Sequence, residues 1–341
     1  MEENVINLRR RLLSKNIDPE AFRDDFFPFE ITWFVTLDCN LKCPYCFLPD
    51  KKPPVVSLQV KDPIEVLKRF KKRGIFKVNV LGGEPFLLRQ TIVDLATHCE
   101  QFGVVYRSTS TNGTIYDKKI NYALKNLRFK HILQVSLDAT NPRTYFLMRG
   151  NKNFELVLEN TTKFVKDGLH VMLGMTLTKY NILEIEDFVR LAEKLGVEMI
   201  SYGGMMPLGR GERVKDWHLS FVEMKDTYKR IKALKTPLQV VLPNDIYGQT
   251  CAAGVGQASM LPNGDLYPCN MLLGIKEAKI GNLFNEQLNK YNNSWFIKLS
   301  ANKVPKKCDE CELPPICDQA CKAICYEYFG DFVKHKPFCE L

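Results

Sequence analysis

Six short β-rich runs alternate with polar, helix-periodic stretches over about half of this 341-residue chain. The runs that we expect to be strands are Ile31–Thr36, Lys77–Leu81, Val104–Ser110, Ile132–Leu137, Val171–Thr178 and Glu198–Tyr202. Helices are expected near residues 61–73, 89–102, 116–126, 152–167 and 182–195. Consecutive βα units form a parallel sheet with right-handed crossovers. Because six units are too few to close a barrel of eight, the alternation predicts an α/β fold built on a partial (β/α)6 barrel.

The alternation stops after Gly211, where the composition changes. We expect a helix at 216–234, a strand at 236–242, and then a cysteine-rich segment with Gly, Pro and Asn between the cysteines. The chain is therefore expected to divide into an N-terminal lead-in helix (1–28), the partial barrel (29–215), a bridging region (216–250) and a small α+β domain (251–341).

Composition narrows the functional classes. No apolar run approaches the roughly 18–20 residues of a membrane helix, and the N-terminal MEENVINLRRRLL lacks the apolar core of a secretory signal. We therefore expect a cytoplasmic protein with no membrane partner. The formal charge of +9 is too small to indicate a nucleic-acid partner, and basic runs such as 68–74 are typical of solvated surfaces.

Twelve cysteines are the most informative part of the composition. In a reduced compartment, clustered thiols hold metal more often than disulfides. Cys39, Cys43 and Cys46 directly follow the first expected strand with the spacing Cys-x3-Cys-x2-Cys. Three close thiolates would leave one iron of a four-iron cluster open, and an open position is typical of catalytic metal sites. A zinc site with a remote fourth ligand is the alternative that the spacing leaves.

The sequence CNLKCPYC, with Tyr45 before its third cysteine, resembles the signature of the radical S-adenosylmethionine (SAM) superfamily. The resemblance implies a [4Fe–4S] cluster on the three cysteines, with SAM bound at the open iron and in contact with Tyr45. It further implies reductive cleavage of SAM to a 5′-deoxyadenosyl radical, which removes a hydrogen atom from the substrate. A low-potential electron donor such as flavodoxin or ferredoxin would supply the electron.

The end of the second expected strand, VLGGEPFL, resembles the GGEP motif of the same family. This resemblance implies that Gly82, Gly83, Glu84 and Pro85 form the site of the SAM ammonium group. Glycines let a backbone approach a ligand closely, and a carboxylate suits a cation. An ordinary glycine turn is the alternative.

The fourth and fifth expected strands carry further similarities. QVSLDA followed by YFLMRG implies that Ser136 contacts the SAM ribose and that Arg149 binds its carboxylate, a sound bidentate pairing. Asp138 is open to another interpretation, as a cap of the next helix. GMTLTKYN resembles the strand that packs its Leu or Met against the adenine. Arg210, in the family-like MMPLGRG, is either a site residue or a solvated loop charge.

The C-terminal cysteines resemble the SPASM domain, which holds up to two auxiliary [4Fe–4S] clusters. The resemblance implies one cluster on Cys308, Cys311, Cys317 and Cys339, and a second cluster on Cys251, Cys269 and Cys321. Cys325 either closes the second cluster, donates a hydrogen atom as a catalytic residue, or is a buried bystander. A zinc ribbon would need only four of these thiols. Cys99, in a helix-like stretch, is expected to be a core thiol.

The sequence constrains the substrate and the type of modification less than it constrains the radical chemistry. The sulfatase-maturating branch has an Asp base after the second SPASM cysteine, but this chain has Asn270, and a neutral amide cannot accept a proton. We expect a peptide or protein substrate that is crosslinked, epimerised or oxidised. The alternatives are a small-molecule enzyme of antibiotic or tetrapyrrole biosynthesis and a non-catalytic iron–sulfur or zinc scaffold. About thirty residues precede the first expected strand, so we expect no leader-peptide recognition domain there.

Overall fold

The computed structural model describes residues 28–48, 61–242, 253–254, 256–285, 323 and 326. Within these ranges lie all six expected barrel strands and one of the expected SPASM cysteines, Cys269. The expected N-terminal helix lies outside the described residues, and so do seven cysteines assigned above, namely Cys251, Cys308, Cys311, Cys317, Cys321, Cys325 and Cys339.

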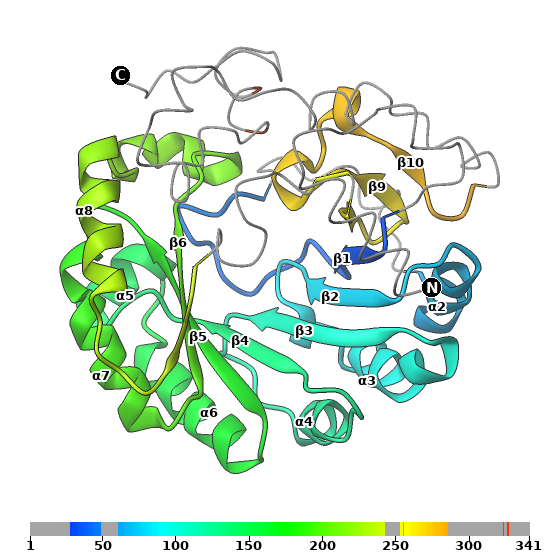
Figure 1. Cartoon of the computed structure of the whole chain (residues 1–341), viewed down its shortest axis with the longest axis horizontal. Helices are drawn as coiled ribbons and strands as arrows, with labels where there is room; N and C mark the ends of the chain where they lie inside the picture. Colours follow the sequence, from blue (N-terminus) through cyan, green and yellow to red (C-terminus); the bar gives the residue numbers. More distant parts are fainter. Residues whose placement is uncertain are drawn as a thin grey trace.

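The six expected strands form neighbouring parallel members of one curved sheet. They are β1 (Glu30–Phe34), β2 (Lys77–Leu81), β3 (Val105–Thr111), β4 (Ile132–Ser136), β5 (His170–Leu177) and β6 (Met199–Gly204). The connecting helices are α2 (Pro63–Lys72), α3 (Arg89–His98), α4 (Lys118–Lys125), α5 (Pro142–Arg149), α6 (Phe154–Lys166) and α7 (Ile185–Leu195). Figure 1 shows these helices on the outer side of the sheet, which confirms the partial barrel.

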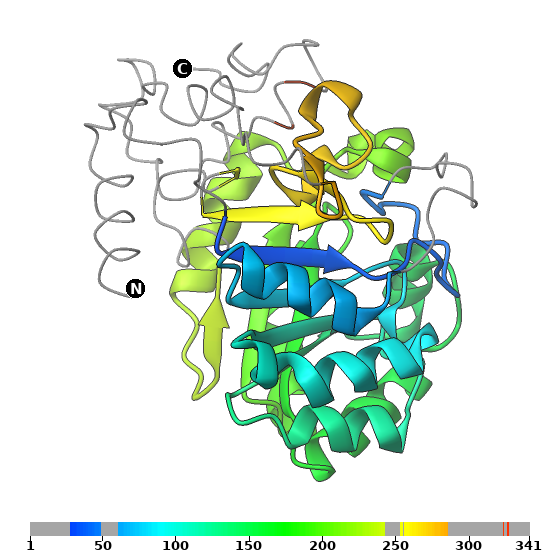
Figure 2. The ribbon, with the colours of Figure 1, turned by 90° about the vertical axis from the view of Figure 1, so that its right-hand side faces the viewer.

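The sheet extends beyond the six expected strands on both sides. β7 (Gln239–Val241) pairs in parallel with β6, and β8 (Gln257–Met260) pairs in parallel with β1. β9 (Asp265–Tyr267) and β10 (Gly281–Asn282) continue from β8 as antiparallel strands. Figure 2 shows β8 beside β1 and pointing the same way. A strand of the C-terminal cysteine-rich segment is thus hydrogen-bonded to the first strand of the barrel.

Alternation along the strands separates an apolar outer face from a polar inner face. In β4, Leu133 and Val135 are fully buried in the main core beneath the helices, whereas Gln134 and Ser136 point the other way and are partly exposed. β2 follows the same pattern. A strand presents alternate residues to opposite faces, so the polar positions of successive strands line the inside of the barrel.

Local signals explain the helix boundaries, including those that the periodicity did not predict. α5, which was not expected, begins at Pro142 after Asn141, whose side chain accepts a hydrogen bond from Thr144 N at 3.0 Å, and it ends at Gly150 with φ +69°. The expected helix at 216–234 is divided into a 3₁₀ segment (Gly209–Trp217) and α8 (Phe221–Lys232), which begins with a capping box from Ser220. No helix of the described residues is long and apolar enough to cross a membrane.

Candidate active site

A cavity of about 410 Å³ opens at the carboxyl ends of the barrel strands, within the usual size range of small-molecule sites. Its walls come from the loop after β1, the loop after β2, the ends of β3 to β6 and the segment after β6. The expected site residues that line it are Cys39, Cys43, Tyr45, Cys46, Gly82, Gly83, Ser136 and Arg149. Loops after the strands of a parallel barrel carry the chemistry of such folds. The structure therefore brings together eight residues that the sequence assigned to one site.

The three thiols of the loop after β1 are surrounded by hydrogen-bond donors. Leu41 N lies 3.4 Å from Cys39 Sγ, and the Asn112 amide donates to the same sulfur at 3.8 Å. Arg149 Nη1 lies 3.7 Å from Cys43 Sγ. Burial raises the pKa of the Cys39 and Cys46 thiols. Without a metal these sulfurs would therefore stay protonated, while donors aimed at sulfur suit thiolates that a cluster holds.

The same thiols do not fit a single metal ion. Within the described ranges, no group of three or more His, Cys, Asp or Glu side chains is gathered closely enough for one ion. A tetrahedral zinc site would bring its sulfurs to about 3.8 Å from one another, because each Zn–S bond is about 2.3 Å long. A cube of four irons and four sulfides separates its thiolates more widely. Three thiols around one cavity with donors on their sulfurs therefore fit a [4Fe–4S] cluster better than zinc.

Arg149 is the clearest sign of the kind of ligand group that the cavity fits. It is the last residue of α5, its side chain is 8% exposed, and its Nε lies 2.8 Å from Asp138 Oδ2 as an ion pair. Its Nη2 atom is buried and has no hydrogen-bond partner. Burial by itself lowers the pKa of the guanidinium, but the neighbouring Asp138 carboxylate and other groups outweigh it and raise the pKa, so the guanidinium remains charged. A buried cationic donor at a cavity wall fits an anionic ligand group such as a carboxylate.

Glu84 lies behind the cavity wall and does not line it. Its carboxylate is fully buried and accepts hydrogen bonds from Phe86 N at 2.9 Å, Thr111 Oγ1 at 2.8 Å and Asn112 N at 2.7 Å. Burial raises the pKa of this carboxyl. Pro85 begins the 3₁₀ turn Pro85–Leu87 and is also buried. The assignment of these two residues to the SAM ammonium group stays a prediction.

The segment after β6 packs its backbone directly onto the cysteine loop. Gly211 N donates to Cys46 O at 3.2 Å, and Arg210 Nε donates to Cys43 O at 3.1 Å. A Cβ on Gly209, whose φ is +59°, would lie 2.2 Å from Leu48 O. Arg210 also lines the cavity, so it is a site residue and not a solvated loop charge. We call Gly209–Gly211 the Gly-Arg-Gly segment.

The inner face of β5 differs from the expectation drawn from GMTLTKYN. Thr176 lines the cavity, whereas Met175 and Leu177 are buried in the core on the other face. The reason is the two-residue period of a strand, which sends the apolar neighbours of Thr176 toward the helices. Sequence reasoning also missed Gln134 and Lys42, which line the cavity. The alternation in QVS, with Val135 buried, was a signal that would have identified Gln134.

The C-terminal segment reaches the same cavity. Cys269 is half-buried at the start of the 3₁₀ turn Asn270–Leu272, and Met271 of that turn lines the cavity. Gly264, with φ +90°, lies in the turn between β8 and β9. Cys99, by contrast, is fully buried in the main core, and burial raises its pKa to about 11, which confirms it as a core thiol.

Comparison with known families agrees with this geometry. Residues 33–192 match the radical SAM superfamily, and residues 251–312 match SPASM, an iron–sulfur cluster-binding domain. The chain belongs to the radical SAM superfamily and carries a SPASM domain. It is accordingly an enzyme that uses SAM and a [4Fe–4S] cluster, with auxiliary iron–sulfur clusters in its SPASM domain.

Among known proteins, the chain is 25% identical over 317 residues to the antilisterial bacteriocin subtilosin biosynthesis protein AlbA of Bacillus subtilis, covering 91% of this chain and 69% of AlbA. It is 26% identical over 343 residues to the AdoMet-dependent heme synthase of Methanosarcina barkeri, covering 92% and 96% of the two chains. Among solved structures, Streptococcus suis SuiB bound to the precursor peptide SuiA shares the fold with a TM-score of 0.74 at 18% identity, covering 99% of this chain and 80% of that one.

Proposed function

We propose that this radical SAM enzyme modifies a peptide or protein substrate by hydrogen-atom abstraction, leading to a crosslink, an epimerisation or an oxidation. AlbA serves the biosynthesis of a bacteriocin, and SuiB binds a precursor peptide. The observation that carries the proposal for this chain is the cavity itself, which joins the three thiols, the unpartnered Arg149 nitrogen and a polar barrel interior.

The residues of the site have separate tasks in this proposal. When bound, the cluster and SAM supply one electron and a 5′-deoxyadenosyl radical that takes a hydrogen atom from the substrate. Cys39, Cys43 and Cys46 hold the cluster, and Arg149 holds the SAM carboxylate. Tyr45, Gly82, Gly83 and Ser136 shape the cavity around SAM. Glu84 orders the loops around the amino group, because its three donors come from the chain after β2 and the end of β3.

The hydrogen-bonding groups of the cavity, rather than its charges, favour a peptide segment. Among the described lining residues, the permanently charged side chains are Lys42, Arg149 and Arg210, all cations, and none is a carboxylate or a histidine. The uncharged polar side chains that line the cavity include amides and hydroxyls, among them Gln134, which accepts from Ser110 Oγ at 3.4 Å. Amide and hydroxyl side chains recognise peptide groups through hydrogen bonds.

The heme synthase relative supports a second candidate, a tetrapyrrole or another small molecule. In both cases we propose that a low-potential donor such as flavodoxin or ferredoxin supplies the electron, and that Cys325 closes the second auxiliary cluster, the one on Cys251, Cys269 and Cys321, or donates a hydrogen atom. The amides and hydroxyls of the cavity lining favour the peptide, because they can hydrogen-bond to its backbone groups.

The class of reaction is tested with anaerobically reconstituted, chemically reduced enzyme. We expect release of methionine and 5′-deoxyadenosine and about twelve iron atoms per chain from three four-iron clusters. The triple variant Cys39→Ala/Cys43→Ala/Cys46→Ala should lose about four of these atoms and all SAM cleavage. Zinc in place of iron, or no deoxyadenosine from reduced enzyme, would contradict the proposal.

The substrate is tested by comparing deoxyadenosine release with peptides from adjacent reading frames and with an iron porphyrin. We expect faster release with a peptide. Deuterium taken up from heavy water into the product would indicate epimerisation, and a product two hydrogens lighter would indicate crosslinking or oxidation. Acceleration by the porphyrin alone would favour the second candidate.

A further inference from the structure

Asp138 lies at the meeting point of three elements that the sequence did not connect. It follows β4 in the loop that leads to α5, it is 1% exposed, and its φ is +66°. It is the one residue other than glycine with a positive φ in the part of the chain that the structure describes. The left-handed region is unfavourable for side chains with a Cβ, and such strain persists only where the surroundings impose it. A buried, strained aspartate directly behind residues that line the cavity requires an explanation.

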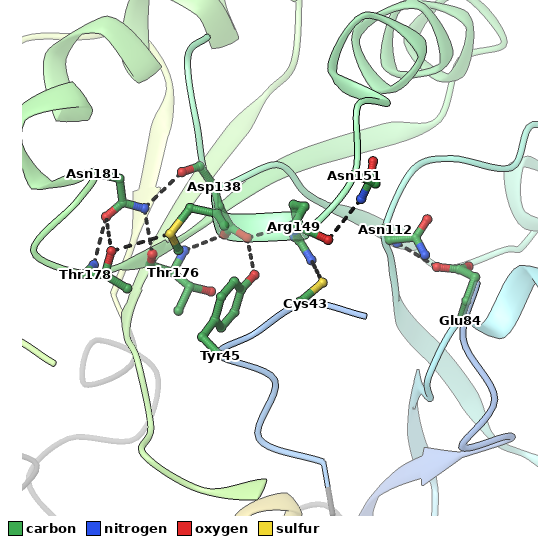
Figure 3. Close-up of polar contacts among 11 residues, drawn as sticks. Cys43, Tyr45, Glu84, Asn112, Asp138, Arg149, Asn151, Thr176, Thr178 and Asn181 are labelled. Atoms are coloured by element: carbon green, nitrogen blue, oxygen red, sulfur yellow. Dashed lines mark hydrogen bonds and ion pairs between the residues drawn. The ribbon is translucent and has the colours of Figure 1, made fainter. Parts of the chain in front are cut away.

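Helix capping does not explain Asp138. The cap of α5 is Asn141, whose side chain accepts from Thr144 N at 3.0 Å. The carboxylate of Asp138 instead points toward the cavity wall, where Figure 3 shows it between Tyr45 and Arg149. The interpretation of Asp138 as a cap, which the sequence allowed, is therefore wrong.

Each oxygen of Asp138 has a defined task. Oδ1 accepts from Thr176 N at 2.7 Å, which fixes the carboxylate against the end of β5. Oδ2 accepts from the Tyr45 hydroxyl and lies 2.8 Å from Arg149 Nε. The backbone oxygen accepts from Asn181 Nδ2 at 2.9 Å, and this bond holds the strained turn in place. The side chain thus links β4, β5, α5 and the cysteine loop.

These contacts of Asp138 fix the orientation of the Arg149 guanidinium. With Nε beside Asp138 and Nη1 beside Cys43 Sγ, the guanidinium is held on two sides and keeps its buried Nη2 atom without a protein partner. An arginine fork held in this way is ready for a carboxylate without a further change of rotamer. The hydroxyl of Tyr45 ties the same carboxylate to the loop that carries the cluster cysteines.

We propose that Asp138 is a positioning residue for SAM: it orients the Arg149 guanidinium toward the SAM carboxylate and locks this arginine to the cluster loop through Tyr45. The inference rests on the proposed role of Arg149 and adds to it a residue that does not itself touch SAM. Asp138 is not among the residues that line the cavity, in agreement with an indirect role.

The main test measures SAM affinity of the cluster-loaded, oxidised enzyme by equilibrium binding, so that no turnover is needed. Asp138→Asn keeps the shape of the side chain, and asparagine tolerates a positive φ. In the parent, Thr176 N, the Tyr45 hydroxyl and Arg149 Nε share two carboxylate oxygens, whereas the amide of the variant offers them only one oxygen. We expect the dissociation constant for SAM to rise about tenfold or more, as for other residues that orient a ligand-binding group. Asp167→Asn is the matched control, because Asp167 accepts from a different tyrosine hydroxyl, Tyr116, at 2.9 Å.

A second variant separates positioning from a purely structural role. Asp138→Gly deletes the carboxylate and at the same time relieves the backbone strain at φ +66°. If Asp138 only shapes the turn, this variant binds SAM like the parent enzyme. If Asp138 positions Arg149, its iron content is unchanged while SAM affinity falls as in Asp138→Asn.

A double-variant cycle with Arg149→Gln distinguishes failure of this inference from failure of the proposed SAM site. We expect Asp138→Asn to add little to the loss caused by Arg149→Gln, since one residue acts through the other. Normal SAM affinity in Asp138→Asn, or additive losses in the double variant, would overturn the role of Asp138. Normal affinity in Arg149→Gln would overturn the SAM-carboxylate assignment itself. The spectral change of the reduced cluster on SAM addition gives an independent readout of the same comparison.

Discussion

Glu84 holds two loops of the site together although its side chain does not line the cavity. Three donors, two backbone N–H groups and a threonine hydroxyl, converge on its two oxygens. In Glu84→Gln the amide nitrogen must face one of these donors, so a buried donor loses its acceptor. We expect a loss of about 1–3 kcal/mol in the free energy of unfolding. Denaturant unfolding measures it, and Glu100→Gln, whose parent accepts one bond from Arg128 N on the surface, should change little.

His131 predicts how the stability of the protein depends on pH. Its ring is 4% exposed, its Nε2 lies 3.0 Å from Thr109 Oγ1, and burial lowers its pKa to about 3. In the unfolded chain the pKa is about 6.5, so below that pH the unfolded state takes up a proton that the folded state refuses. The contribution of the neutral His131 ring to the free energy of unfolding is therefore present above pH 6.5 and is lost as the pH falls toward 3. Between pH 7.5 and pH 5 the free energy of unfolding should fall by about 2 kcal/mol because of this residue.

The variant His131→Gln removes this titration, and its stability should fall less between pH 7.5 and pH 5 than that of the parent. Denaturant midpoints at the two pH values measure the difference. His98→Gln serves as the control, since His98 lies on α3 outside this buried pair. An equal pH dependence in the parent and in His131→Gln would show that His131 is not the responsible group.

At the scale of elements, the two glycines of the Gly-Arg-Gly segment let the chain after β6 pack closely against the backbone of the cysteine loop. Gly209→Ala would place a methyl group 2.2 Å from Leu48 O at a backbone φ of +59°, so the cysteine loop must move. We expect the variant to lose about four iron atoms per chain, the content of one cluster. Gly203→Ala, on β6, is the control, because a Cβ there meets nothing within 4 Å. Full iron content in Gly209→Ala would show that the segment does not hold the loop.

Sequence reasoning reached the elements whose signal is local. The six strands and the cavity cysteines follow from alternation and spacing, since both patterns are written in neighbouring residues. The short helix α5 was missed because its signals are caps, Asn141 and Gly150, within a stretch too short for periodicity. Asp138 and the Gly-Arg-Gly segment were not predicted in their roles, because Tyr45 is 93 residues from Asp138 and Cys43 is 167 residues from Arg210 in the chain. Only the folded barrel brings such pairs together.

At the scale of the whole molecule, the pairing of β8 with β1 means that the expected boundary near residue 251 is not a boundary of the sheet. β1 is hydrogen-bonded on both sides, to β2 and to β8, and Met260 of β8 is fully buried in the same core as Ile31. In the described sheet, β7 is the outer strand beyond β6. Amides of a strand with two partners exchange more slowly than those of an edge strand, because a larger unit must open.

Hydrogen exchange of the complete chain tests this arrangement. We expect amides of Glu30–Phe34 to be protected at least as strongly as those of β2, and amides of Gln239–Val241 to exchange faster. Met260→Ala, which leaves a cavity between β8 and the core, should increase exchange in β1 as well as in β8, while β5 should change little. If β1 exchanged as fast as β7 and ignored Met260→Ala, the SPASM segment would fold as a separate body. The protected outcome would mean instead that β8, β9 and β10, which lie next to Cys269 in the chain, extend the same sheet whose strand ends line the cavity.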